Sequence, residues 1–151
     1  MKKIISGAAI LLVMLVLSCK KGNAVLNAWT FKNLSYSADS AAYNSTGGGA
    51  VFANATGSEL IVYFPGGLPA TSTTYTVATG DSSLPPSHVY IGLLTALAEY
   101  HSTAGNGSNQ TVTVNVASGG KISLSGSNIE VVNNVMPSDS SSVSFNFSLV
   151  K

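Results

Sequence analysis

Residues 142–150 have the sequence Ser-Val-Ser-Phe-Asn-Phe-Ser-Leu-Val, in which polar and apolar side chains alternate from Ser142 to Leu149. Successive side chains of a β-strand point to opposite faces, so this pattern predicts a strand with one apolar and one polar face. The apolar face would consist of Val143, Phe145, Phe147 and Leu149. We expect this face to be buried in a sheet.

The sequence just before this stretch shows the same period. Residues 111–116 and 121–125 also alternate, and they flank the glycine turn Ser118-Gly119-Gly120. Two alternating runs joined by such a turn predict a β-hairpin. Residues 128–132 resume the β pattern after Gly126. The C-terminal third is therefore predicted to be antiparallel sheet.

The earlier part of the chain holds shorter runs rich in β-branched and aromatic residues, at residues 28–36, 50–55, 59–64 and 73–78. We expect a bulge near Asn33 within the first run. Residues 41–49 end in three consecutive glycines and are predicted to form a loop.

Residues 88–103 fit two structures. The spacing of Leu93, Leu94, Leu97 and Ala98 is compatible with a helical stripe, whereas two strands joined by a tight turn near Thr95 are equally compatible with the pattern. We favour strands, because every neighbouring segment is β and no capping box precedes the run. The whole pattern predicts an all-β domain over residues 28–151, an antiparallel β-sandwich or small barrel of about eight to ten strands.

The N-terminus has the features of an export signal. Lys2 and Lys3 precede the apolar residues 4–17, which as a helix would span roughly 21 Å. That length is short of the ~30 Å hydrocarbon core of a membrane. Residues 1–18 are therefore predicted to form a signal helix that is removed, rather than a transmembrane helix.

Val16-Leu17-Ser18-Cys19 resembles the lipobox of bacterial lipoproteins, and Cys19 is the single cysteine of the chain. The resemblance implies cleavage between Ser18 and Cys19, covalent diacylglycerol and acyl lipid on Cys19, and residues 19–27 as a tether to a membrane. The alternative is an ordinary secretory signal with a chance cysteine. Some lipoproteins carry an aspartate directly after the cysteine that retains them in the inner membrane, and this chain has Lys20 there instead. The absence of that aspartate favours the outer membrane of the cell envelope and leaves open which leaflet holds the protein.

Several motifs of the β region together resemble small lipoproteins of Bacteroidota. These motifs are Trp29-Thr30-Phe31, a Leu-Ile-Val-Tyr-Phe-Pro strand at 60–65, Thr-Tyr-Thr-Val at 74–77, a Gly-Gly-Lys hairpin at 119–125 and the alternating strand at 143–149. The resemblance implies a lipobox followed by a single β domain. It implies no specific activity, because such domains are mostly of unknown function.

The composition argues against nucleic-acid binding. Charged residues make up 9% of the chain and none of them is arginine. The lysines are scattered, whereas binding to phosphates needs a basic face. The partners that remain open are membrane lipid through Cys19 and a protein, glycan or small molecule.

The candidate chemistry in this sequence is sparse. His88 and His101 are the two histidines, and with Glu99 or Asp81 they form a weak candidate metal site. Glu99 and His101 would share one face of a strand, and the two histidines would face each other across a hairpin. The alternative is a pair of surface histidines beside turns.

No Gly-x-Ser-x-Gly elbow occurs, so a hydrolase would require one of the histidines to meet a serine or carboxylate in a cleft. The aromatic residues are expected in the core rather than on a sugar-stacking surface. We expect a non-enzymatic binding or interaction module on a lipid tether, with no cofactor. The alternative is a lipocalin-like carrier, which would enclose a small apolar ligand in a cavity of several hundred Å³.

Overall fold

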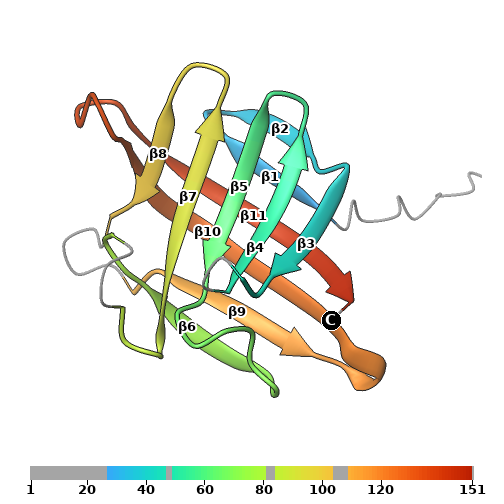
Figure 1. The fold of residues 1–151 in the computed structure, drawn as a ribbon. Helices are drawn as coiled ribbons and strands as arrows, with labels where there is room; N and C mark the ends of the chain where they lie inside the picture. The colour runs from blue at the N-terminus through green and yellow to red at the C-terminus, as the bar shows by residue number, and fades with distance from the viewer. Residues whose placement is uncertain (1–26, 47–48, 81–83, 104–108, 151) are drawn as a thin grey trace, which may run out of the picture.

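The computed structural model describes residues 27–46, 49–80, 84–103 and 109–150, and these residues form an all-β fold (Figure 1). The predicted signal helix, Ser18, Cys19, Asp81 and nearly all of the tether lie outside the described residues. Within the described part, no helix has the length and apolarity needed to cross a membrane. The described strands are β1 (Ala28–Phe31), β2 (Leu34–Ser37), β3 (Ser40–Asn44), β4 (Ala50–Ala55), β5 (Ser58–Tyr63), β6 (Thr73–Val77), β7 (His88–Thr95), β8 (Glu99–Ser102), β9 (Thr111–Val116), β10 (Lys121–Asn133) and β11 (Ser140–Val150).

The strands combine a small barrel with two arms. The sheet order is β2-β1-β11-β10-β9-β6-β7-β5-β4-β3, and β8 pairs with both β7 and β10. This pairing closes β6, β7, β8, β10 and β9 into a five-stranded barrel. One arm, β5-β4-β3, continues from β7, and the other, β11-β1-β2, continues from β10; Figure 1 shows the two arms crossing each other as two layers. All pairings are antiparallel except that of β6 with β7.

The core fills both the barrel and the space between the arms. In β11 the four residues predicted for the apolar face are all buried, which confirms the alternation. Trp29 of β1 stacks on Tyr36 with ring centroids 5.2 Å apart, and Phe145 stacks on Phe147 at the same distance. Inside the barrel the buried side chains include Tyr75, Val89, Ile91, Val112, Val114, Ile122, Leu124 and Val131.

The ambiguous run at residues 88–103 forms two strands, as favoured. β7 ends at Thr95 and β8 begins at Glu99, so the reversal lies at the expected place. Thr95 fixes it, because its hydroxyl donates to the carbonyl oxygen of Ala98 at 2.9 Å and accepts from the Ala98 amide at 3.0 Å. The hairpin of residues 111–125 is also confirmed.

Two expectations for the N-terminal part are wrong. The run at 28–36 is a hairpin of β1 and β2 rather than one bulged strand, because Lys32 and Asn33 both adopt positive φ, at 49° and 63°. Two consecutive residues with positive φ form a tight turn whose twist matches that of the two strands it joins. Residues 41–44, predicted to lie in a loop, belong to β3, which pairs with β4 along its whole length. Pairing with β4 outweighs the weak β pattern of this segment.

A bulge interrupts β10 where it crosses β11. Gly126 pairs with Phe145 and Ile129 pairs with Val143, so Ser127 and Asn128 together lie opposite a single residue. Asn128 takes up the extra length with a φ of 52°. The bulge also shifts the alternation, so that even-numbered residues point inward before it and odd-numbered residues after it. One long strand can thereby serve both the barrel and the arm.

Candidate functional site

Hydroxyl and amide side chains line up across the outward side of the barrel and the β11-β1-β2 arm. One row crosses four strands through Thr74, Thr113, Ser125 and Asn146, each paired with the next. All four are exposed or half-buried, while their strand neighbours point inward. We call this surface the hydroxyl face; its residues are Thr30, Ser35, Thr74, Thr76, Thr111, Thr113, Asn115, Ser123, Ser125, Ser144, Asn146 and Ser148.

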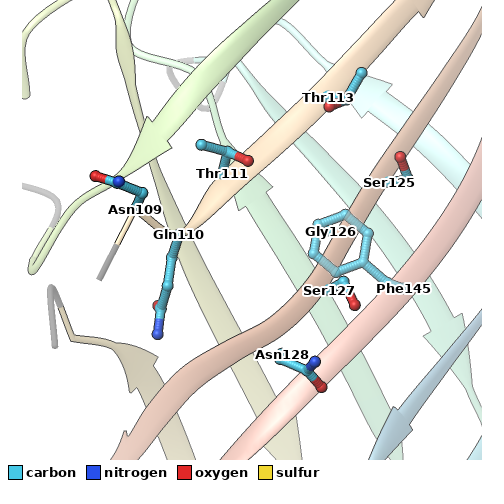
Figure 2. Close-up of a pocket in the computed structure, with 9 residues that line it drawn as sticks. All are labelled: Asn109, Gln110, Thr111, Thr113, Ser125, Gly126, Ser127, Asn128 and Phe145. Atoms are coloured by element: carbon cyan, nitrogen blue, oxygen red, sulfur yellow. The ribbon is translucent and has the colours of Figure 1, made fainter. Parts of the chain in front are cut away.

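The bulge of β10 opens a groove in the hydroxyl face. The groove has a volume of about 590 Å³ and is lined by Asn109, Gln110, Thr111, Thr113, Ser125, Gly126, Ser127, Asn128 and Phe145. Figure 2 shows Gln110 and Thr111 on one side, Ser127 and Asn128 on the other, and the Phe145 ring beside Gly126. Because Gly126 has no side chain, the Phe145 ring, which is 4% exposed, can pack closely against its backbone at the border of the groove.

Hydrogen bonds to the backbone hold the two sides of the groove. The Gln110 side-chain oxygen accepts the amide of Glu130 at 3.1 Å, so the Gln110 amino group is left to donate. On the other side, the backbone amide of Asn128 donates to the Ser144 hydroxyl at 2.9 Å. Apart from Gly126 and Phe145, the described lining residues carry amide or hydroxyl groups, which donate and accept hydrogen bonds without titrating near neutral pH.

Two further depressions adjoin the groove. One, of about 310 Å³, lies over β1, β2 and β11 and shares Gly126 and Phe145 with the groove. The other, of about 400 Å³, shares Asn128 and is lined mainly by hydroxyl and amide residues, with Lys32 at its edge. The three depressions together make a hollowed surface that extends from β9 to β1.

An ion-pair cluster at one end of the strands joins residues far apart in sequence. The Lys32 ammonium lies 2.6 Å from an Asp139 carboxylate oxygen and donates to the Tyr100 hydroxyl at 2.9 Å, and that hydroxyl donates to Asp139 at 2.7 Å. Hydrogen bonds from Lys32, Tyr100 and Asn133 lower the pKa of Asp139 to about 2. The hydrogen bonds that Lys32 makes to Asp139 and Tyr100 raise the pKa of the Lys32 ammonium. The cluster ties the β1–β2 turn to β8 and to the β10–β11 loop.

The loops around this cluster are apolar at their tips. Leu97 of the β7–β8 turn is 97% exposed and Val135 of the β10–β11 loop is 87% exposed, and Leu34 and Met136 are exposed as well. They border two depressions of about 360 and 460 Å³ that both contact Lys32 and Tyr100. This end of the molecule is chemically distinct from the hydroxyl face.

The histidines do not come together. His101 pairs with Gly92 of β7, four residues beyond His88, which corresponds to roughly 13 Å along the strand. The expectation that the two histidines face each other is therefore wrong. Glu99 and His101 do share the outward side of β8, where Asn134 contacts both side chains. Among the described residues, no three His, Cys, Asp or Glu side chains group closely enough to hold a metal ion.

Trp29, Tyr75 and Tyr100 lie in the core, as expected, whereas Tyr36, Tyr43, Tyr63 and Tyr90 are half-buried. The sequence analysis missed both the groove and the Lys32–Asp139 cluster. The alternation at 111–125 did identify the outward Thr and Ser residues, but it gave no sign of the bulge that hollows the surface. No family model, no curated protein and no solved structure matches this chain.

Proposed function

We propose that this chain is a lipid-anchored lipoprotein of the cell envelope, and that its β domain is a non-enzymatic binding module that acts through the groove of the hydroxyl face. The observation that carries the proposal is the groove itself, which has a volume of about 590 Å³ and is lined mainly by hydroxyl and amide residues on and beside paired strands. Sites built on strands hold their side chains in place better than sites built on loops, which favours recognition.

The start of the domain is compatible with the proposed tether. Asn27 is held at its place, because its carbonyl oxygen accepts the Ala38 amide and its side-chain oxygen accepts the Ser148 amide, both at 2.7 Å. Asn27, the last residue of the predicted tether 19–27, is thus bonded to the β domain. The eight residue-to-residue steps from Cys19 to Asn27 span at most roughly 28 Å, which would keep the domain close to a membrane surface.

The chemistry of the groove supports binding rather than catalysis. General acid–base catalysis needs a group that titrates near the working pH, and the described lining consists of neutral amides, hydroxyls and an aromatic ring. The buried side chains inside the barrel support a surface site over the alternative of an internal carrier cavity. Both observations favour a ligand held on the outside of the strands.

The lipid anchor is tested by Cys19→Ser. We expect the variant to lose incorporation of labelled fatty acid and to leave the membrane fraction or remain uncleaved. Ser18→Ala, which keeps a small residue before the cysteine, should behave like the wild type. If Cys19→Ser still takes up the label and sediments with membranes, the anchor is not at this residue.

The binding site is tested without assuming a ligand. Mature protein on beads is exposed to a detergent extract of the cell envelope, and the retained carbohydrate, lipid and protein are weighed separately. Ser125→Trp places a bulky side chain in the groove and should abolish retention. Asn54→Trp puts the same side chain on the exposed surface of β4, in the other arm, and should retain as much as the wild type. Equal retention by both variants would contradict the proposed site.

A further inference from the structure

We infer that the groove and its two neighbouring depressions bind an extended, uncharged glycan. The inference rests on the proposed function and specifies the class of ligand. It draws on two features of the described residues: the chemistry of the lining and the length of the hollowed surface.

The lining matches the hydrogen-bonding character of sugars. Each glycan hydroxyl both donates and accepts, and so do the hydroxyls of Thr111, Thr113 and Ser125 and the amide of Asn128. A charged ligand entering this groove would give up hydration without meeting an opposite charge in the described lining, which is unfavourable. Lys32, which lines one of the adjoining depressions, is engaged by Asp139. A neutral ligand avoids this cost.

The surface is longer than one sugar unit. The groove lies over β9 and β10, and the two depressions that share residues with it reach β11, β1 and β2. Neighbouring strands lie ~4.8 Å apart, so the distance from β9 to β1 across three strand spacings is roughly 14 Å. A chain of several sugar units would cover it, with successive units contacting successive strands.

The aromatic residues beside these hollows belong to the core. Phe145 borders both the groove and the adjoining depression and Trp29 borders the second, but their side chains are only 4% and 1% exposed. Protein-binding surfaces, by contrast, are enriched in aromatic residues, Met and Arg at their centres. The hydroxyl face carries threonine, serine and asparagine instead, which favours a glycan over a protein.

The test uses the mature lipidated protein in phosphatidylcholine vesicles. The probes are uncharged polysaccharides (dextran, mannan, galactan and xylan) together with carboxymethyl-dextran and diethylaminoethyl-dextran as charged versions of one backbone. Binding is measured by interferometry on the captured vesicles, with protein-free vesicles as the blank. We expect at least one uncharged polysaccharide to bind, and the charged dextrans to bind less than dextran does.

Two conservative variants locate the binding. Thr113→Val removes a hydroxyl without changing the shape of the side chain, and Asn128→Gly removes an amide while tolerating the positive φ. Each should weaken the affinity about two- to tenfold, the effect of one net hydrogen bond. Asn54→Ala on β4 is the control and should leave it unchanged.

The outcomes separate this inference from the proposed function. In one outcome, charged dextrans bind as tightly as dextran, and Thr113→Val weakens the affinity for all of them. That result would overturn the neutral class of ligand while the groove would remain a binding site. Failure of every uncharged polysaccharide also overturns the inference, and the envelope-extract experiment with Ser125→Trp then decides the proposed function by itself. Glycan binding that both groove variants leave unchanged would overturn the assignment to this face.

Discussion

Gly126 can be tested by adding a single methyl group. A Cβ built at this position would lie 2.6 Å from Cδ1 of Ile129 and 2.7 and 2.8 Å from two ring carbons of Phe145. Carbon atoms in favourable contact are about 3.5–4.0 Å apart, so each contact is too short by roughly 1 Å. Overpacking of this kind costs about 1–3 kcal/mol. We therefore expect Gly126→Ala to destabilise the fold by that amount.

Gly66→Ala is the matched control. Gly66 has no atom within 4 Å of its added Cβ, and neither glycine has a positive φ. Both substitutions restrict the unfolded chain in the same way, which by itself stabilises by about 0.4–1 kcal/mol. The difference between the two variants therefore isolates the steric cost at Gly126.

Urea denaturation followed by tryptophan fluorescence measures this difference. Trp29 is the single tryptophan and is 1% exposed, so its emission reports on unfolding. The midpoint of Gly126→Ala should fall while the slope stays unchanged. Adding Phe145→Leu should cost less in the alanine background than in the wild type, because the smaller side chain relieves the overlap. Equal midpoints for Gly126→Ala and Gly66→Ala would refute the close packing of the bulge.

Two further predictions concern the arm and the ion-pair cluster. Phe147→Ala, at a fully buried residue, should cost about 3–5 kcal/mol, whereas Asn146→Ala on the exposed face should change stability by about 0.5 kcal/mol or less, as measured by denaturation midpoints. Asp139 has its pKa lowered from 3.8 to about 2 in the folded state, so its contribution to stability is complete above pH ~4 and is lost as the pH falls towards 2. Thermal unfolding of Asp139→Asn between pH 2 and 6 should lack this component of the acid dependence, and an unchanged pH profile would show that the cluster does not stabilise the fold.

The strands that depend on side-chain alternation could be predicted from sequence. β9, β11 and the first half of β10 all alternate strictly, because one face is buried and the other is in water. β2 and β3 could not be predicted in this way, because they are short, lie at or near sheet edges and bury little. Their existence depends on pairing with β1 and β4, which is a tertiary contact.

The candidate site could be predicted only in its composition. The outward residues of β9 and β10 follow from the alternation, but the groove arises from a two-for-one mismatch between β10 and β11, which depends on the register between two strands. The Lys32–Asp139 pair is separated by 107 positions, and no local motif marks either residue. The histidines show the opposite case: their residue type suggested chemistry, and the strand register placed them apart.

The position of β1 has a mechanical consequence if the chain is tethered as proposed. A pull from the membrane enters the domain at Asn27 and runs along β1, which is bonded to β11 on one side and β2 on the other. Tension along the strand loads these bonds together, as shear, rather than opening them one after another. On one side of β1 lies β11, whose Phe145 borders the groove. Drag on a ligand bound at the groove would therefore reach the anchor across a single strand pair, β11 with β1.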